Sequence, residues 1–116
     1  MTELISARPA PAILFALLCA LIGSMTESPA QPAPDKANID RGEQIYQDYC
    51  ATCHGDGLQN TSNGVTYDLR RLRADERARF VNGVLGGKGQ MPPWRGALET
   101  EQVELIWLYV RAVVDR

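Results

Sequence analysis

The stretch YCATCHGDG, residues 49–57, decides which fold this chain can adopt. It contains Cys50 and Cys53 with two residues between them, and His54 directly follows the second cysteine. His54 is the only histidine among 116 residues, and Cys19 is the one other cysteine. Two thiols and an imidazole within five positions indicate a chemical site, and four kinds of site have to be weighed.

Three of these kinds agree less well with the rest of the sequence. A structural zinc ion takes four Cys or His ligands, and beyond residue 30 the chain offers only Cys50, Cys53 and His54. A thiol–disulfide enzyme places its CxxC at the start of a helix after a strand, and no βαβ pattern is found here. A structural disulfide across two residues would close a very small loop and stabilise little.

The fourth kind is the C-x-x-C-H pattern of covalent c-type haem attachment. Two cysteines three positions apart, on a helical turn that runs into a loop, can present both sulfurs to the vinyl groups on one porphyrin edge. The next residue then supplies an axial nitrogen to the iron. We therefore predict that Cys50 and Cys53 form the thioethers and that His54 is the proximal ligand. Gly55 and Gly57 would let the chain turn away from the ring.

An electron carrier also needs a sixth ligand for the iron. Met1 and Met25 lie near the N-terminus, which leaves Met91 as the one methionine of the remaining chain. It stands in the loop GQMPPW, where Pro92 restricts Met91 to an extended backbone. A lone methionine in a polar, Gly-rich loop is a poor core residue, so we predict that Met91 is the distal ligand. The alternative is that Met91 fills a gap in the core.

Residues 1–30 have the features of a secretory signal peptide. Arg8 precedes an uncharged apolar run over residues 12–23, which is shorter than the roughly 20 residues that span a bilayer. Small residues fit cleavage after Ala30. The alternative is an uncleaved anchor that holds the protein at the membrane. Because free CxxC thiols do not persist in an oxidising compartment, export also favours a covalent use of the cysteine pair.

The remaining chain is predicted to be a flexible linker, residues 31–38, followed by one folded domain, residues 39–116. The linker is polar and rich in Pro and Ala. Asp40 is the predicted N-cap of a helix that ends at Tyr49. The cysteine pair would then close this first helix.

Two more helices are predicted, over residues 74–85 and 101–114, the second with Thr100 as its N-cap. Its apolar residues follow the spacing of one helix face: Val103, Ile106, Trp107, Val110 and Val114. No alternating strand pattern is found, so the sequence predicts an all-α domain. The long loops over residues 55–73 and 86–96 indicate that a cofactor organises so small a domain.

With these motifs, residues 39–113 resemble a class I (monohaem) c-type cytochrome of the small bacterial periplasmic type. The resemblance implies the cytochrome c fold, with three main helices and long loops wrapped around one covalently bound haem c and its iron. It also implies that Gly42 and Tyr46 of the first helix meet Ile106 and Tyr109 of the last.

The function implied is that of a periplasmic electron carrier and not of an enzyme. Single electrons would pass through a haem ligated by His54 and Met91. Residues 66–96 are similar to cytochromes that serve quinoprotein (PQQ) alcohol dehydrogenases, which suggests such an enzyme as donor and a terminal oxidase as acceptor. The alternative function is a haem enzyme or gas-ligand sensor with a displaceable sixth ligand.

The expected partners are redox proteins that dock transiently onto a monomer. A net charge of -2 gives no general attraction to nucleic acid, and a membrane is expected as a partner only if the N-terminal segment stays uncleaved. Trp94 and the arginines Arg70, Arg71 and Arg73 are candidates to reach the haem propionates. For the arginines, the alternative is a solvated surface.

Overall fold

The computed structural model describes residues 30–116, so the predicted signal peptide, apart from Ala30, lies outside the described residues. The described part contains the helices α1 (Lys36–Tyr49), α2 (Ala51–His54), α3 (Arg77–Gly86) and α4 (Thr100–Val114). It forms no β-strand, and the all-α class predicted from the sequence is confirmed. None of the helices in this part of the chain is long and apolar enough to cross a membrane.

Helix α1 begins five residues earlier than predicted. Its N-cap is Asp35, whose side chain accepts a hydrogen bond of 2.9 Å from the Asn38 N–H, whereas Asp40 lies inside the helix. Pro34 disfavours a helical conformation at Ala33, the residue before it, so the helix does not extend further toward the N-terminus. The carboxylate of Asp40 pairs with Lys36 instead, at 2.5 Å. Helix α1 therefore begins within the predicted linker, whose last three residues, 36–38, are helical.

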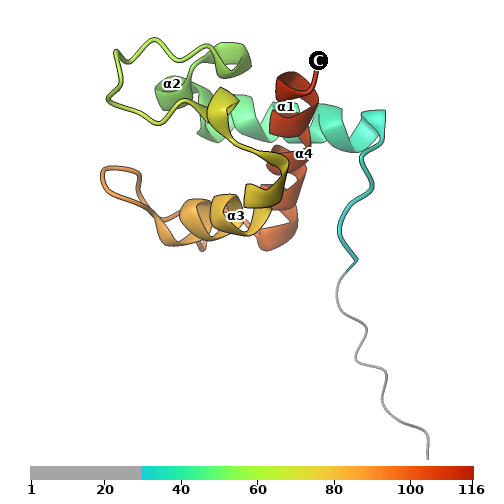
Figure 1. The fold of residues 1–116 in the computed structure, drawn as a ribbon. Coiled ribbons are helices and arrows are strands. Elements are labelled where there is room, and N and C mark those ends of the chain that lie inside the picture. The colour runs from blue at the N-terminus through green and yellow to red at the C-terminus, as the bar shows by residue number, and fades with distance from the viewer. Residues whose placement is uncertain (1–29) are drawn as a thin grey trace, which may run out of the picture.

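Helices α1 and α4 cross in direct contact (Figure 1). A Cβ on Gly42 would stand 2.0 Å from the carbonyl oxygen of Leu105, so only glycine allows this approach. One turn later the ring of Tyr46 lies 5.2 Å from the ring of Tyr109. The predicted contacts of Gly42 and Tyr46 with Tyr109 are thus present, and Ile106 is fully buried in the same core.

Helix α3 packs on the other side of α4. Phe80 lies 5.3 Å from Trp107 between ring centres, and Arg77 forms an ion pair with the buried Glu104. The first three residues of the predicted helix form a separate 3₁₀ turn, Ala74–Glu76. Thr100 is the first residue of α4, and the cap is Glu99, which forms a reciprocal capping box with Gln102.

The two long loops lie at the same end of the molecule, away from the start of α1 (Figure 1). The loop after α2 runs through a short 3₁₀ turn, Leu69–Arg71, and the loop after α3 returns to that helix. Three main helices therefore form a scaffold, and the loops and α2 border the site described next.

Candidate functional site

A largely apolar cavity of about 600 Å³ lies between α2, α3 and the two long loops. Its wall includes all four residues that the sequence singled out: Cys50, Cys53, His54 and Met91. Helix α3 contributes Phe80, Gly83 and Val84, and α4 contributes Ile106. Cys50 and Met91, which are 41 positions apart in the sequence, are thus brought together around one space.

The cysteine pair lies where α1 ends and α2 begins. Cys50 is the C-cap of α1, and its N–H donates to the carbonyl of Tyr46 at 2.8 Å. Both thiols are free, with Cys50 buried and Cys53 exposed. Burial, and to a lesser extent the neighbouring Cys53, raises the pKa of the Cys50 thiol to about 11. A reactive redox thiol needs the opposite shift, so this environment disfavours a thiol–disulfide enzyme.

His54 is half-buried and held by a single main-chain group. Its Nδ1 lies 3.1 Å from the carbonyl oxygen of Tyr67. Because a carbonyl can only accept, Nδ1 carries the proton and Nε2 keeps its lone pair. Burial also lowers the pKa of His54, although the hydrogen bond to Tyr67 opposes this shift. A neutral imidazole with a free Nε2 is the form that binds a metal ion.

Two further hydrogen bonds fix the backbone of this segment. The hydroxyl of Tyr46 donates to the carbonyl of Gly55 at 2.6 Å, and the hydroxyl of Thr66 donates to the carbonyl of Cys53 at 2.9 Å. Gly55 has φ of 87°, and a Cβ there would stand 2.0 Å from the carbonyl oxygen of Gln59. The chain can therefore reverse behind His54 only because residue 55 is glycine.

Met91 lies on a turn that is tied to the end of α3. Two hydrogen bonds of 3.0 Å join Lys88 and Met91, and Gly89 at the tip has φ of 58°. Just beyond the prolines, the N–H of Trp94 donates to the carbonyl of Val84 at 3.0 Å. The thioether is therefore carried by a loop that is fixed on both sides of Met91.

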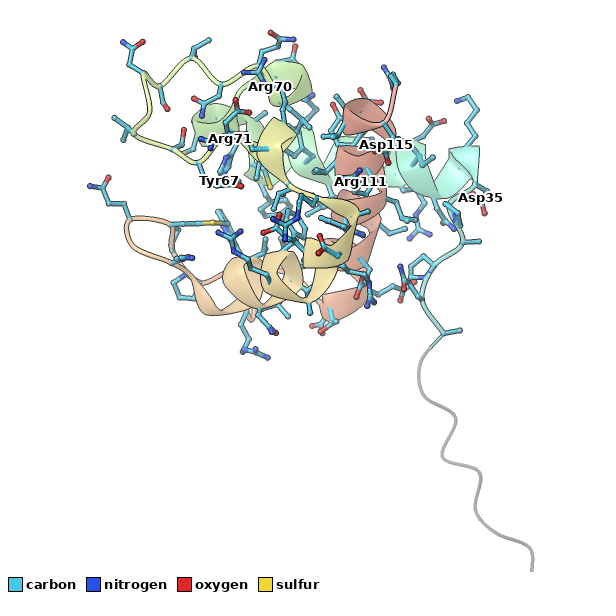
Figure 2. All side chains as sticks on the ribbon, in the orientation of Figure 1. Asp35, Tyr67, Arg70, Arg71, Arg111 and Asp115 are labelled. Atoms are coloured by element: carbon cyan, nitrogen blue, oxygen red, sulfur yellow. The ribbon has the colours of Figure 1, made fainter. Side chains whose placement is uncertain are left out.

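The arginines expected near the propionates take other positions. Arg70 pairs with Asp68 at 2.8 Å and Arg73 pairs with Asp75 at 3.0 Å. Arg70 and Arg71 lie on the long loop together with Tyr67 (Figure 2). Neither these two arginines nor Arg73 lines the cavity, which agrees with the alternative of a solvated surface.

Arg79 and Tyr67 are among the residues of the cavity wall that the sequence analysis missed. The guanidinium of Arg79 lies 5.6 Å from the centre of the Tyr67 ring and 2.5 Å from the carboxylate of Glu76. Helical spacing could have identified Arg79, since it lies one turn before Gly83 on the same face of α3. Trp94, which was predicted near the site, does line the cavity.

The cavity fits an iron porphyrin in size and in donor atoms. Its volume lies within the usual range of cofactor sites. No heavy atom lies within 4 Å of the place where a Cβ on Gly83 would stand, so α3 presents an open helix surface to the cavity. Two thiols, one imidazole and one thioether are the groups that c-type haem uses. Among residues 30–116, no cluster of three or more Cys, His, Asp or Glu residues suits a zinc ion.

Comparison with known proteins identifies the family. Residues 37–110 match the family described as cytochrome C oxidase, cbb3-type, subunit III. The chain is 34% identical to quinohemoprotein alcohol dehydrogenase ADH-IIG of Pseudomonas putida, over 73% of this chain and 12% of that protein. It is 27% identical to the cbb3-type cytochrome c oxidase subunit FixP of Bradyrhizobium diazoefficiens, over 79% of this chain and 32% of that protein.

A third relative is cytochrome c6 of Nostoc sp., which is 28% identical over 88% of this chain and 94% of that protein. The chain thus spans a small part of the dehydrogenase and of FixP, and nearly all of cytochrome c6. No solved structure matches. Because the family match covers most of the described residues, the chain belongs to this family of class I c-type cytochrome domains, whose cofactor is a covalently bound haem c with its iron.

Proposed function

We propose that the protein is an exported, monomeric electron carrier in which Cys50 and Cys53 bind the haem covalently and His54 and Met91 bind its iron. The observation that carries this proposal is the hydrogen bond from His54 Nδ1 to Tyr67, which leaves Nε2 as the free donor in a cavity that Met91 also lines. Haem iron supplies reversible one-electron chemistry. The chain supplies its attachment, its axial ligands and an apolar surrounding.

The apolar wall should set the direction of the redox potential. Phe80, Val84 and Ile106 are buried and line the cavity, so they exclude water from its interior. An apolar surrounding favours the ferrous state because that state carries less charge, and a thioether ligand acts in the same direction. We therefore expect a positive potential, as suits a carrier.

The partners and the location belong to this proposal as well. A quinoprotein alcohol dehydrogenase is our proposed donor, since ADH-IIG is among the relatives, and a terminal oxidase is the proposed acceptor. The side chains of Tyr49 and Tyr67 line the cavity and are 40% and 43% exposed, so we place electron exchange at this rim. The periplasm is the proposed location, with an N-terminal membrane anchor as the alternative.

Covalent attachment is tested on protein made together with a haem-maturation system. The mass of the mature chain should include one haem, and acidic organic solvent should leave the colour on the protein. Thiol titration of the denatured chain should find neither Cys50 nor Cys53 free. Colour that extracts completely, or a mature chain without the mass of haem, would overturn the proposal.

The sixth ligand distinguishes a carrier from a haem enzyme or gas sensor. Met91→Ala should abolish the absorption band of iron–thioether ligation and open the reduced iron to carbon monoxide. Gln90→Ala, at the exposed tip of the same turn, should leave both properties unchanged. If the unmodified reduced protein binds carbon monoxide rapidly, the sensor or enzyme alternative is favoured. Mixing with a reduced quinoprotein dehydrogenase, followed in a stopped-flow instrument, tests the donor.

A further inference from the structure

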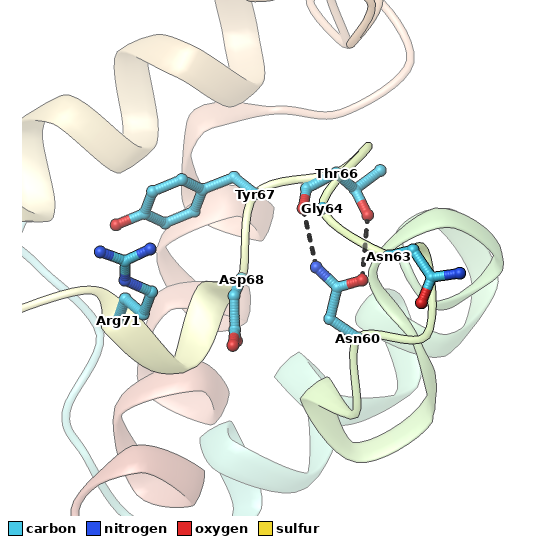
Figure 3. A pocket seen from close by; sticks show the side chains of 7 residues that line it. All are labelled: Asn60, Asn63, Gly64, Thr66, Tyr67, Asp68 and Arg71. Carbon is cyan, nitrogen blue, oxygen red and sulfur yellow. Dashed lines mark hydrogen bonds between the residues drawn. The ribbon is translucent and has the colours of Figure 1, made fainter.

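The Tyr67 carbonyl, which accepts the hydrogen bond from His54, belongs to a loop segment that separates two cavities. Thr66 and Tyr67 line the large cavity on one side, and on the other side they line a second, polar hollow of about 340 Å³ (Figure 3). This segment has no helix or strand hydrogen bonds of its own, because it lies in the irregular part of the loop. Water in the open hollow competes for its polar groups. Something else has to fix the Tyr67 carbonyl.

Asn60 supplies the main fixing contacts. Its Nδ2 donates to the carbonyl of Thr66 at 2.7 Å, and its Oδ1 accepts from the N–H of Ser62 at 2.9 Å. Ser62 Oγ in turn accepts from the N–H of Thr66 at 2.9 Å. Both main-chain polar groups of Thr66, the residue before Tyr67, are thus held by side chains from the preceding turn. Figure 3 shows Asn60 directed at Thr66.

The hydroxyl protons complete this cluster. Thr66 Oγ1 lies 2.9 Å from the carbonyl of Cys53, which can only accept, so the Thr66 hydroxyl donates to it. The Ser62 hydroxyl then donates within the cluster, toward Asn60 Oδ1 at 2.6 Å or Thr66 Oγ1 at 2.7 Å. The cluster therefore connects the loop to the CxxCH segment at two places: through Thr66 to Cys53 and through Tyr67 to His54.

We propose that Asn60 is a positioning residue for the proximal ligand: its side chain fixes Thr66, and thereby the Tyr67 carbonyl that orients His54. This inference rests on the proposed function, in which His54 Nε2 binds iron. A carbonyl that accepts from Nδ1–H fixes the ring and makes the imidazole a stronger donor. A stronger donor stabilises the ferric state more than the ferrous state, so Asn60 lowers the redox potential.

Replacing Asn60 by alanine should therefore raise the potential. We expect the ferric/ferrous equilibrium to shift about threefold toward ferrous, a modest effect for a partner one step removed from the ligand. With 59 mV for each tenfold change in a one-electron couple, this shift is about 28 mV. The Nδ1 proton of His54 should also exchange faster with solvent, as followed by NMR of the ferrous protein.

Other variants separate positioning from general loosening of the loop. Thr66→Val removes the hydroxyl donor to Cys53 and should raise the potential in the same direction, whereas Thr66→Ser keeps the hydroxyl and should restore the unmodified value. Asn63→Gly is the matched control. Asn63 lies on the same loop with φ of 53°, a conformation that glycine adopts without strain, and within residues 30–116 its side chain makes no hydrogen bond.

Higher potentials for Asn60→Ala and Thr66→Val, with unchanged values for Thr66→Ser and Asn63→Gly, support the inference. If Asn60→Ala fails to accumulate, the Thr66→Val and Thr66→Ser pair decides it in the same way. Unshifted potentials and unchanged proton exchange overturn it. The unmodified protein tests the proposed function separately: attached haem with iron–thioether absorption leaves that function standing even where the variants overturn the role of Asn60.

Discussion

Gly42 of α1 lies against the main chain of Leu105 in α4, so close that a Cβ would stand 2.0 Å from the Leu105 oxygen. The same Cβ would stand 3.2 Å from the Cβ of Tyr109. This approach fixes where the two helices cross. Because Cys50 caps the C-terminal end of α1, the crossing also fixes the position of the cysteine pair relative to α4.

Gly42→Ala is therefore expected to force α1 and α4 apart. The free energy of unfolding should fall by about 1–3 kcal/mol, the usual cost of overpacking, as measured by urea denaturation. Gly86→Ala is the matched control, since Gly86 ends α3 and nothing lies within 4 Å of its added Cβ. If both variants unfold at the same urea concentration, the contact with Leu105 does not limit the helix crossing.

Tyr46→Phe tests the hydrogen bond behind the CxxCH segment. Tyr46 is 0% exposed, and removal of its hydroxyl leaves the carbonyl of Gly55 without this partner. We expect a loss of about 1–3 kcal/mol in the free energy of unfolding, the cost of an unsatisfied buried polar group. Tyr49→Phe, at a residue that is 40% exposed, should leave stability unchanged. Equal stability of both variants would contradict the role assigned to the Tyr46 hydroxyl.

Arg77 and Glu104 form the ion pair that joins α3 to α4. Glu104 is 7% exposed, so Arg77→Ala leaves a buried carboxylate without its partner. The free energy of unfolding should fall by about 1–3 kcal/mol. This loss is smaller than for a fully buried ion pair because the side chain of Arg77 is partly solvated. The double variant Arg77→Met with Glu104→Gln should recover part of this loss.

The control for this ion pair is Arg73→Ala. Arg73 and Asp75 also form a pair, but their side chains are 70% and 72% exposed, so no measurable change is expected. A double variant less stable than Arg77→Ala would show that Glu104 is stabilised without Arg77.

Local patterns predicted that the three main helices exist, and they singled out four residues that the structure places around one cavity. The spacing of Cys50, Cys53 and His54 is a pattern within five consecutive residues, and the apolar face of α4 is a pattern within fifteen. Both can be identified without knowledge of the fold. The same holds for Met91, which is the one methionine beyond residue 30 and is followed directly by two prolines. The structure places these four residues in one cavity, and their roles toward the iron stay predictions.

Contacts between distant segments could not be predicted in this way. The partner of His54 is the main-chain carbonyl of Tyr67, and every residue of the loop has such a carbonyl. Asp35 and Asp40 are equally good caps by residue type, and only the structure shows that Asp40 pairs with Lys36. Arg79 was missed because its charge alone does not distinguish it from Arg77, and its spacing from Gly83 is informative only once that face of α3 is known to border the cavity.

The turn that carries Met91 depends on Gly87. Its φ is 75°, and a Cβ there would stand 2.8 Å from both the carbonyl oxygen of Met91 and the nitrogen of Pro93. Gly87→Ala should therefore push the turn away from the end of α3. If Met91 is the distal ligand, the variant should lose the iron–thioether band and bind carbon monoxide when reduced, while the haem stays attached through Cys50 and Cys53.

Gly89→Ala separates this displacement from backbone strain. Gly89 also has positive φ, 58°, but nothing lies within 4 Å of its added Cβ. Both variants therefore place alanine at a positive φ, which costs about 1–3 kcal/mol, and only Gly87→Ala, at φ of 75° and ψ of 161°, adds a clash with the main chain of Met91. We expect Gly89→Ala to keep the band. Loss of the band in both variants would mean that strain at the turn, and not the clash, releases the sulfur; retention in both would mean that the position of Met91 does not decide the sixth ligand.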